Sequence, residues 1–278
     1  MYSASLLAVI TPRFDWELFF RFIFPPSNPL LGGLAITIYA AIAAQIIGVI
    51  LGVLAALAGM ANNPILRSIS RVYVMFFRGT PLLVQIALLY YGTPYLLGVD
   101  LFPTEIKIGL IPWAGAILAG IIALGVNEGA FMSEIVRAGI ISVDPGQTEA
   151  ARSLGMTYRL TMSRIILPQA LRVIVPPLGN EFNAMLKNTS LLSVIAVGEL
   201  FRYATSIAAS TFQPFEPLLA VSVYYLLLTA IWSWIQARIE RRLGVSIAPE
   251  QRPSVMQRMF GLRRRTKPDD AVGIPSIR

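Results

Sequence analysis

Long apolar runs alternate with short polar or basic segments along this chain of 278 residues. No charged residue occurs between Leu30 and Ala61, and further apolar runs cover about 81–97, a stretch beginning near Pro112, 171–197 and about 217–235. A helix of about 20 apolar residues crosses a hydrocarbon core about 30 Å thick. The pattern therefore predicts an all-α fold, a polytopic membrane helix bundle with about five transmembrane helices.

Small residues recur every four positions within two of the apolar runs. The first run carries Ala40, Ala44, Gly48, Gly52 and Ala56, and the third carries Gly115, Ala119 and Ala123. Such stripes allow the backbones of two membrane helices to approach closely. We interpret them as packing faces rather than as the lining of a pore.

The polar segment 144–168 carries its own folding signals. Asp144 can cap a helix, Pro145 suits its first position, and Gln147 can complete a capping box. The helix is expected to end near Leu154, where Gly155 supplies a left-handed residue. A second short helix is expected from about Thr157, ended by Pro168. We therefore predict a sharp elbow between two membrane spans.

Basic residues gather on one side of the predicted membrane. They lie before the second span (Arg67, Arg71, Arg78), around the elbow (Arg137, Arg152, Arg159, Arg164) and in the tail. Cytoplasmic loops of membrane proteins carry this excess, which accounts for the net charge of +8 without nucleic acid. Five spans with the N-terminus outside and the C-terminus in the cytoplasm satisfy it.

The boundaries divide the chain into three parts. Residues 1–29 are expected outside, without a cleaved signal peptide, and with an interfacial helix where aromatic and charged residues mix over 14–22. Residues 30–240 form the transmembrane domain. Residues 241–278 have several prolines, the run Arg263–Arg265 and no long apolar run, and we expect a disordered cytoplasmic tail.

Composition removes several kinds of chemistry. The chain has no cysteine and no histidine, which excludes disulfides, thiolate or histidine zinc sites and Ser-His-Asp triads. No G-x-x-x-x-G-K-[ST] sequence occurs, so ATP cannot be bound through a P-loop. We expect no catalytic residue, no metal and no cofactor, and we expect any ATP hydrolysis to take place on another chain.

The elbow resembles a known family of transport proteins. Glu149-Ala150-Ala151, then Gly155, then Ile165-Ile166-Leu167-Pro168 are similar to the EAA loop of ABC-importer permeases. The resemblance implies the ABC type I importer permease fold, with residues from about 138 to 168 as the cytoplasmic coupling loop that docks on an ATPase. It also implies that Glu149 offers charge to the ATPase, that Ala150 and Ala151 allow close approach, and that Gly155 sets the bend.

Three further segments narrow the resemblance. Phe76–Gln85, Asn127–Gly139 and Gly179–Leu191 are similar to segments of the polar amino-acid (histidine/glutamine permease-like) family. Membership implies a multi-pass subunit of the inner (plasma) membrane that imports polar or charged amino acids by alternating access. The implied partners are an ATPase dimer, a second permease subunit, identical or homologous, and an external amino-acid-binding protein.

Polar residues inside the spans are the candidates for a substrate path: Glu128, Asn180, Glu181, Asn183 and Lys187. Ionisable groups within a span usually face a wet cavity or another helix. Lys187 can meet the carboxylate of an amino acid, and Glu181 or Glu128 its ammonium. Two alternatives stay open. Glu128 can sit at a hydrated helix end, and the Asn180–Asn183–Lys187 stripe can pack against the partner permease or form an outer gate.

Glu134 and Arg137, three residues apart, are spaced for an ion pair at the cytoplasmic end of the third span.

Two other classes of protein are alternatives to the ABC permease. A secondary transporter is expected to show internal repeats, and we find no clear repeat between the chain halves. A membrane scaffold subunit of an enzyme complex has no need of a capped elbow.

Overall fold

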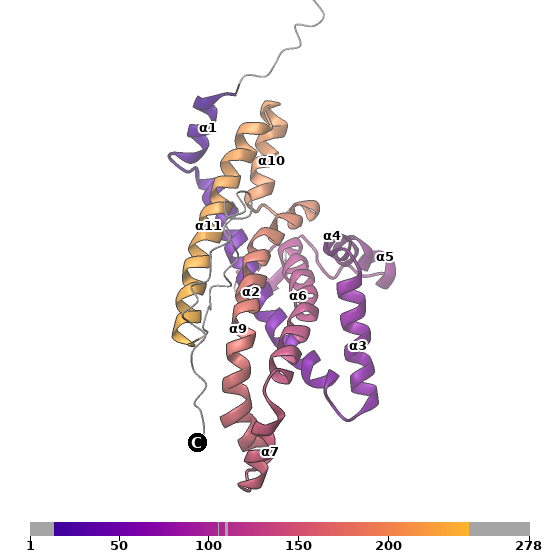
Figure 1. The fold of residues 1–278 in the computed structure, drawn as a ribbon. Coiled ribbons are helices and arrows are strands. Elements are labelled where there is room, and N and C mark those ends of the chain that lie inside the picture. Colours follow the sequence, from indigo (N-terminus) through magenta and orange to yellow (C-terminus); the bar gives the residue numbers. More distant parts are fainter. Residues whose placement is uncertain (1–13, 105, 109–110, 245–278) are drawn as a thin grey trace, which may run out of the picture. The chain divides into compact units, whose positions relative to one another are not determined.

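The structure, a computed structural model, describes residues 14–104, 106–108 and 111–244. These residues form a helical bundle with one small hairpin (Figure 1). The α-helices are α1 (Trp16–Ile23), α2 (Asn28–Gly59), α3 (Pro64–Gly79), α4 (Leu82–Ala87), α5 (Thr93–Leu97), α6 (Gly115–Ile141), α7 (Pro145–Ser153), α8 (Tyr158–Thr161), α9 (Leu167–Asn188), α10 (Leu200–Thr211) and α11 (Phe215–Arg242). Between them lie the π-helical turns η1 (Leu88–Gly92) and η2 (Met162–Ile166), the 3-10 helix η3 (Thr189–Ile195), and strands β1 (Ile106–Ile108) and β2 (Ile111–Trp113).

Helices α2 and α6 form the centre of the bundle and pack along the two predicted small-residue stripes. All five members of the α2 stripe and all three members of the α6 stripe are buried. A Cβ added at Gly52 would collide with the Cβ of Met132 and lie 3.0 Å from the backbone of Met132 and Ser133. The interpretation of these stripes as packing faces is confirmed.

Three helices are long and apolar enough to cross a membrane: α2, α6 and α11. Two bent pairs qualify as well, α3 with Leu82–Leu97 at 105° and Tyr158–Ile195 with α10 at 48°. The described residues therefore provide up to five spans if each bent pair counts as one. The expected all-α bundle is found, with the short hairpin as an addition.

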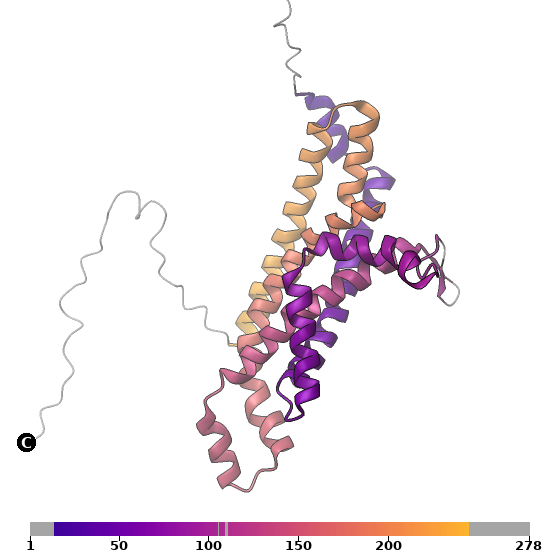
Figure 2. The same cartoon turned by 90° about the vertical axis from the view of Figure 1, so that its right-hand side faces the viewer.

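The second span differs from the prediction. The segment expected to be a basic loop forms α3, which begins after Asn63, whose side chain accepts a hydrogen bond from Ile65 N at 2.9 Å. The helix ends just before Pro81, which has no N–H to continue it. Residues 82–97 then turn sharply away from α3 (Figure 2), and the two segments are bent by 105°, so they do not form one straight span.

The segment after α5 contains an antiparallel hairpin that the sequence did not suggest. Strand β1 pairs with β2 in the register Ile106↔Trp113, Lys107↔Pro112 and Ile108↔Ile111. Each strand is only three residues long, which explains why no alternation of apolar and polar residues marked it.

Helices α1 and α10 lie at one end of the bundle, and α7 lies at the opposite end (Figure 1). The predicted helix near 14–22 is α1, capped by Asp15, and α10 is capped by Glu199. The place of α1 in a membrane interface stays a prediction, as do the boundaries at 29 and 240. The predicted disorder of the tail concerns mainly residues 245–278, outside the described part of the chain.

Candidate functional site

The elbow at 144–168 begins as its capping residues predict. Asp144 Oδ1 accepts a hydrogen bond from Gly146 N at 2.7 Å, and Pro145 occupies the first turn of α7, where no N–H is needed. Gln147 donates only its backbone N–H, to Asp144 O at 3.0 Å, among the interactions described. The helix start is therefore confirmed, with a simple side-chain cap in place of the reciprocal capping box.

Gly155 ends α7 in the left-handed conformation, with φ of +76°. Its N–H donates to Arg152 O at 2.9 Å, and the next N–H, of Met156, donates to Ala151 O at 3.0 Å. This pair of bonds is a Schellman motif, which satisfies the last carbonyls of a helix and reverses the chain sharply. Gly155 therefore sets the bend, as its position in the sequence predicts.

The elbow presents a mixed polar and apolar tip. Glu149 and Ala150 are exposed, whereas Ala151 is buried. Leu154 and Tyr158, on either side of the bend, are 81% and 70% exposed. Apolar side chains this exposed at a capped turn have nothing to cover them within the described chain, which is typical of a contact surface for another molecule.

The second arm of the elbow differs from the prediction. Helix α8 begins at the Thr157 cap as expected, but helical structure continues through η2 into α9. Pro168 therefore begins a helix instead of ending one. A proline is tolerated in the first turn of a helix, and the wider π turn of η2 precedes it and absorbs the change of hydrogen bonding.

A buried polar pair lies in the centre of the α2–α6 interface. The side chain of Glu128 is almost fully buried, and its Oε1 accepts a hydrogen bond from Gln45 Nε2 at 3.2 Å. Gly48 makes room for it, since a Cβ there would collide with the Glu128 side chain. Glu128 thus lies between two helices and not at a hydrated helix end, and its partner is an amide rather than a cation.

A second polar group ties α6 to the bend between α3 and α4. Asn127 Nδ2 donates to Phe77 O at 2.9 Å and to Gln85 Oε1 at 3.0 Å. Gln85 Nε2 in turn donates to Thr80 Oγ1 at 2.7 Å. These amides satisfy carbonyls freed where the helix breaks, so Gln85 holds the bend through hydrogen bonds.

The α9 candidates are divided between two surroundings. Asn180 Oδ1 accepts from Gln236 Nε2 and Asn183 Nδ2 donates to Ser233 Oγ, both at 3.2 Å, so both asparagines face α11. Glu181 is half-buried and Lys187 is exposed. The two asparagines of α9 therefore contact α11, whereas Glu181 lies near enough to Glu128 for the two carboxylates to repel each other.

Sequence reasoning missed three residues that complete these polar contacts: Gln45, Ser233 and Gln236. Gln45 had a usable signal, since it is the one amide between Leu30 and Ala61. Nothing in the sequence marks Ser233 and Gln236, because their roles depend on which face of α11 meets α9.

The ion pair Glu134–Arg137 is confirmed at 3.3 Å, with Arg78 3.9 Å from the same carboxylate. Within the described ranges, no group of three His, Cys, Asp or Glu residues could hold a metal ion.

The described residues thus combine helices long and apolar enough to cross a membrane with an exposed, capped elbow at one end. The chain belongs to the family described as binding-protein-dependent transport system inner membrane component, which matches residues 48–245. It is thus the permease component of an ABC importer, and neither a secondary transporter nor a scaffold subunit accounts for the match.

Individual relatives agree with this assignment. The chain is 42% identical over 230 residues to the probable amino-acid permease protein YxeN of Bacillus subtilis, covering 83% of this chain and 96% of the relative. It is 38% identical over 232 residues to the arginine transport system permease protein ArgU of Corynebacterium glutamicum, covering 81% and 70%. A crystal structure of an amino acid ABC transporter with histidines matches with a TM-score of 0.71 and 37% identity, covering 83% of this chain and 99% of that chain.

Proposed function

We propose that this permease imports polar or charged amino acids by alternating access, driven by ATP hydrolysis on two separate ATPase subunits. An external amino-acid-binding protein delivers the substrate. The names of the relatives support the substrate class, since they specify amino acids and, in one case, arginine. The absence of a P-loop sequence from the chain supports an ATPase on another subunit.

The observation that carries the coupling proposal is the exposed tip of the elbow. Leu154 and Tyr158 supply apolar area, Glu149 supplies charge, and the Schellman turn at Gly155 keeps them in a fixed arrangement. A docked elbow transmits motion only if its contacts with the ATPase differ between the two states of the transporter. Because α6 precedes the elbow and α9 follows it, a movement of the ATPase that displaces a rigid tip also displaces these two helices.

The proposed orientation follows from the elbow. If the tip meets an ATPase, the end of the bundle that carries α7 is cytoplasmic, and α1 and α10 lie outside (Figure 1). Arg241 and Arg242 in the last turn of α11 support a cytoplasmic C-terminus.

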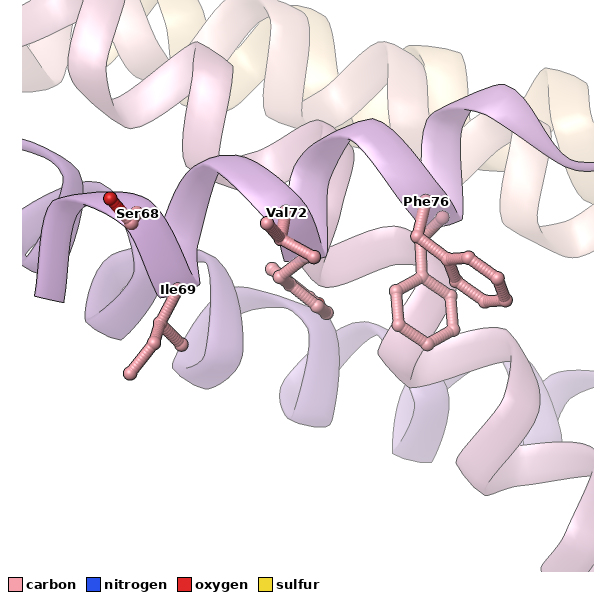
Figure 3. Close-up of a pocket in the computed structure, with 6 residues that line it drawn as sticks. Ser68, Ile69, Val72 and Phe76 are labelled. Carbon is pink, nitrogen blue, oxygen red and sulfur yellow. The ribbon is translucent and has the colours of Figure 1, made fainter. Parts of the chain in front are cut away.

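A second permease subunit is proposed to cover part of the remaining apolar surface. One face of α3 carries Ile69, Val72 and Phe76, which are 60%, 57% and 52% exposed. In Figure 3 these side chains point to the same side of α3, where a hollow of about 530 Å³ lies. An apolar hollow of this kind accepts side chains of a neighbouring helix, and a homodimer or a heterodimer would satisfy it.

The substrate path is proposed to involve α9, where Lys187 and Glu181 are not hydrogen-bonded to α11 in the contacts described. Replacing Lys187 with Gln or Glu181 with Gln is expected to weaken uptake of a charged amino acid severalfold, about 1 kcal/mol per lost ion pair. Co-purification with the ATPase should be unaffected. Unchanged uptake kinetics for both variants would remove these residues from the path.

The function as a whole is tested by purifying the chain with its ATPase and placing the complex in vesicles. ATP-dependent uptake is measured in competition with Arg, Glu, Gln and His in the presence of the binding protein. One of these amino acids should compete at low concentration. Failure of all four, with ATPase activity intact, would refute the substrate class, and transport without any ATPase would refute the mechanism.

A further inference from the structure

A cavity of about 970 Å³ lies between α2, α6 and α9, next to the elbow. Its walls are apolar: all its lining residues are apolar except Asn62, Arg152 and Tyr158. The cavity opens to the surface along α2, since Val53 and Leu57 line it and are 37% and 54% exposed. It is therefore a groove on the side of the bundle and not an enclosed chamber.

The depth of the groove corresponds to one leaflet of a bilayer. Val49 and Leu57 line it on α2 and are separated by eight residues, which is about 12 Å along a helix. Half of the hydrocarbon core of a membrane is about 15 Å thick. The apolar wall on α2, from Val49 toward the end of the helix at Gly59, is therefore comparable in length with one leaflet, which is the depth of an acyl chain.

All the polar groups of the groove lie at its elbow end. Asn62 follows the end of α2, Arg152 belongs to α7, and Tyr158 begins α8. No Asp or Glu lines the groove, and the ion pairs found among the described residues involve Arg78 and Arg137, not Arg152. The guanidinium of Arg152 is thus available, and its fork of N–H donors matches the oxygens of a phosphate.

We propose that this groove binds an anionic phospholipid of the leaflet on the elbow side of the membrane. Arg152 binds the phosphate together with Asn62, and an acyl chain lies along Val49 and Leu57. A zwitterionic amino acid fits the groove poorly, because its ammonium would find no carboxylate there. The bound lipid joins α2 to the elbow, so it connects the composition of the membrane with the position of the coupling helix.

The test uses the complete transporter, purified with its ATPase and reconstituted with either phosphatidylglycerol or phosphatidylcholine. Native mass spectrometry measures how much of each lipid stays bound. The wild-type complex should retain phosphatidylglycerol preferentially. Arg152→Gln should lower that preference about fivefold, the usual contribution of one Arg near an anionic lipid. Arg159→Gln, an exposed arginine of α8 outside the groove, is the matched control and should retain the preference.

A second variant tests the groove independently of the charge. Val53→Trp fills the apolar wall and should reduce retention of both lipids. Equal lipid retention in Arg152→Gln and Arg159→Gln would overturn the assignment of the headgroup, and full retention in Val53→Trp would overturn the assignment of the groove. If Arg152→Gln loses the ATPase while lipid retention is unchanged, Arg152 serves the ATPase contact and the proposal is wrong. The link to the coupling helix rests on the proposed function, but lipid retention is measured without any amino-acid substrate, so its failure is distinct from a failure of the proposed substrate class.

Discussion

The elbow at 144–168 and the α2–α6 interface both depend on glycine, but for different reasons. Gly155 adopts φ of +76° and has nothing within 4 Å of an added Cβ, whereas Gly52 is helical and an added Cβ would collide with Met132. The first glycine is needed for its backbone conformation and the second for the absence of a side chain. One controls the direction of the chain, and the other controls the distance between helices.

The difference determines what each region can tolerate. At the elbow, a side chain is accepted if it can adopt the left-handed conformation. At the interface, a side chain of any conformation is too large. Substitutions that separate conformation from size therefore test whether the two regions work as described.

Replacing Gly155 with Val is expected to have the largest effect. A β-branched residue at this φ costs about 1–2 kcal/mol or more and should unwind the Schellman turn. The permease should still insert in the membrane, but ATP-driven uptake in vesicles should fall about tenfold or more, the factor that 1.4 kcal/mol represents. ATP hydrolysis should continue without transport.

Gly155→Asn is the matched control, because asparagine adopts the left-handed conformation more readily than other residues with a side chain. It should keep most of the uptake. Equal uptake in the Val and Asn variants would show that the bend is not the feature that couples ATP hydrolysis to transport.

Gly52→Ala is expected to destabilise the bundle by about 1–3 kcal/mol, because Met132 and its backbone must shift to accommodate the methyl group. Gly32→Ala, on the same helix with open space around it, should be neutral or gain up to about 1 kcal/mol, since alanine favours helices over glycine. Thermal unfolding of the detergent-solubilised complex measures both. A Gly52→Ala variant that is as stable as Gly32→Ala would contradict close packing at Gly52.

The elbow was largely predictable because its signals are local. The Asp144 cap, Pro145 and Gly155 each act on residues within four positions, so the sequence contains the whole interaction. The exception is Pro168, where the sequence predicted an end and the structure continues. Proline is compatible both with stopping one helix and with starting another, and only the continuation into α9 decides between them.

For the buried interface, the sequence predicts the close packing of the helices but not which polar residues form hydrogen bonds across it. The repeat of small residues on α2 and α6 predicts close contact, but not which residues meet. Glu128 was identified as an ionisable residue inside a span, but its partner Gln45, which lies 83 residues away in the chain, was not. Similarly, the asparagines of α9 were assigned to a path before α11 could be placed against them. The bend between α3 and α4 was missed because both segments are apolar and helical, and only a break in direction separates them.

Gln45→Leu is expected to have a smaller effect than Gly52→Ala, about 1 kcal/mol of destabilisation. It leaves the buried Glu128 without its amide donor, but hydrogen bonds between membrane helices contribute only about 0.6 kcal/mol on average. It also removes Gln45 Oε1, which is buried without a partner among the described residues. Thermal unfolding should therefore show a modest loss.

A double variant identifies the interaction. Gln45→Leu combined with Glu128→Leu should cost less than the sum of the two single changes, because the second substitution removes the carboxylate that the first left unpaired. Strictly additive losses would mean that the amide and the carboxylate do not stabilise each other.

Arg137→Gln is expected to have the smallest effect, because it concerns an exposed ion pair and neither the bend of the elbow nor the buried interface. Arg137 and Glu134 form an ion pair at 3.3 Å near the end of α6, but their side chains are 45% and 39% exposed. Solvent screens such a pair, so its loss should change stability by about 0.3 kcal/mol, which is within the error of thermal unfolding. Glu134→Gln should cost slightly more, because Arg78 lies 3.9 Å from the same carboxylate. A loss comparable to that of Gly52→Ala would mean that the pair is covered in the assembled transporter, since only burial by a partner subunit makes one exposed ion pair that valuable.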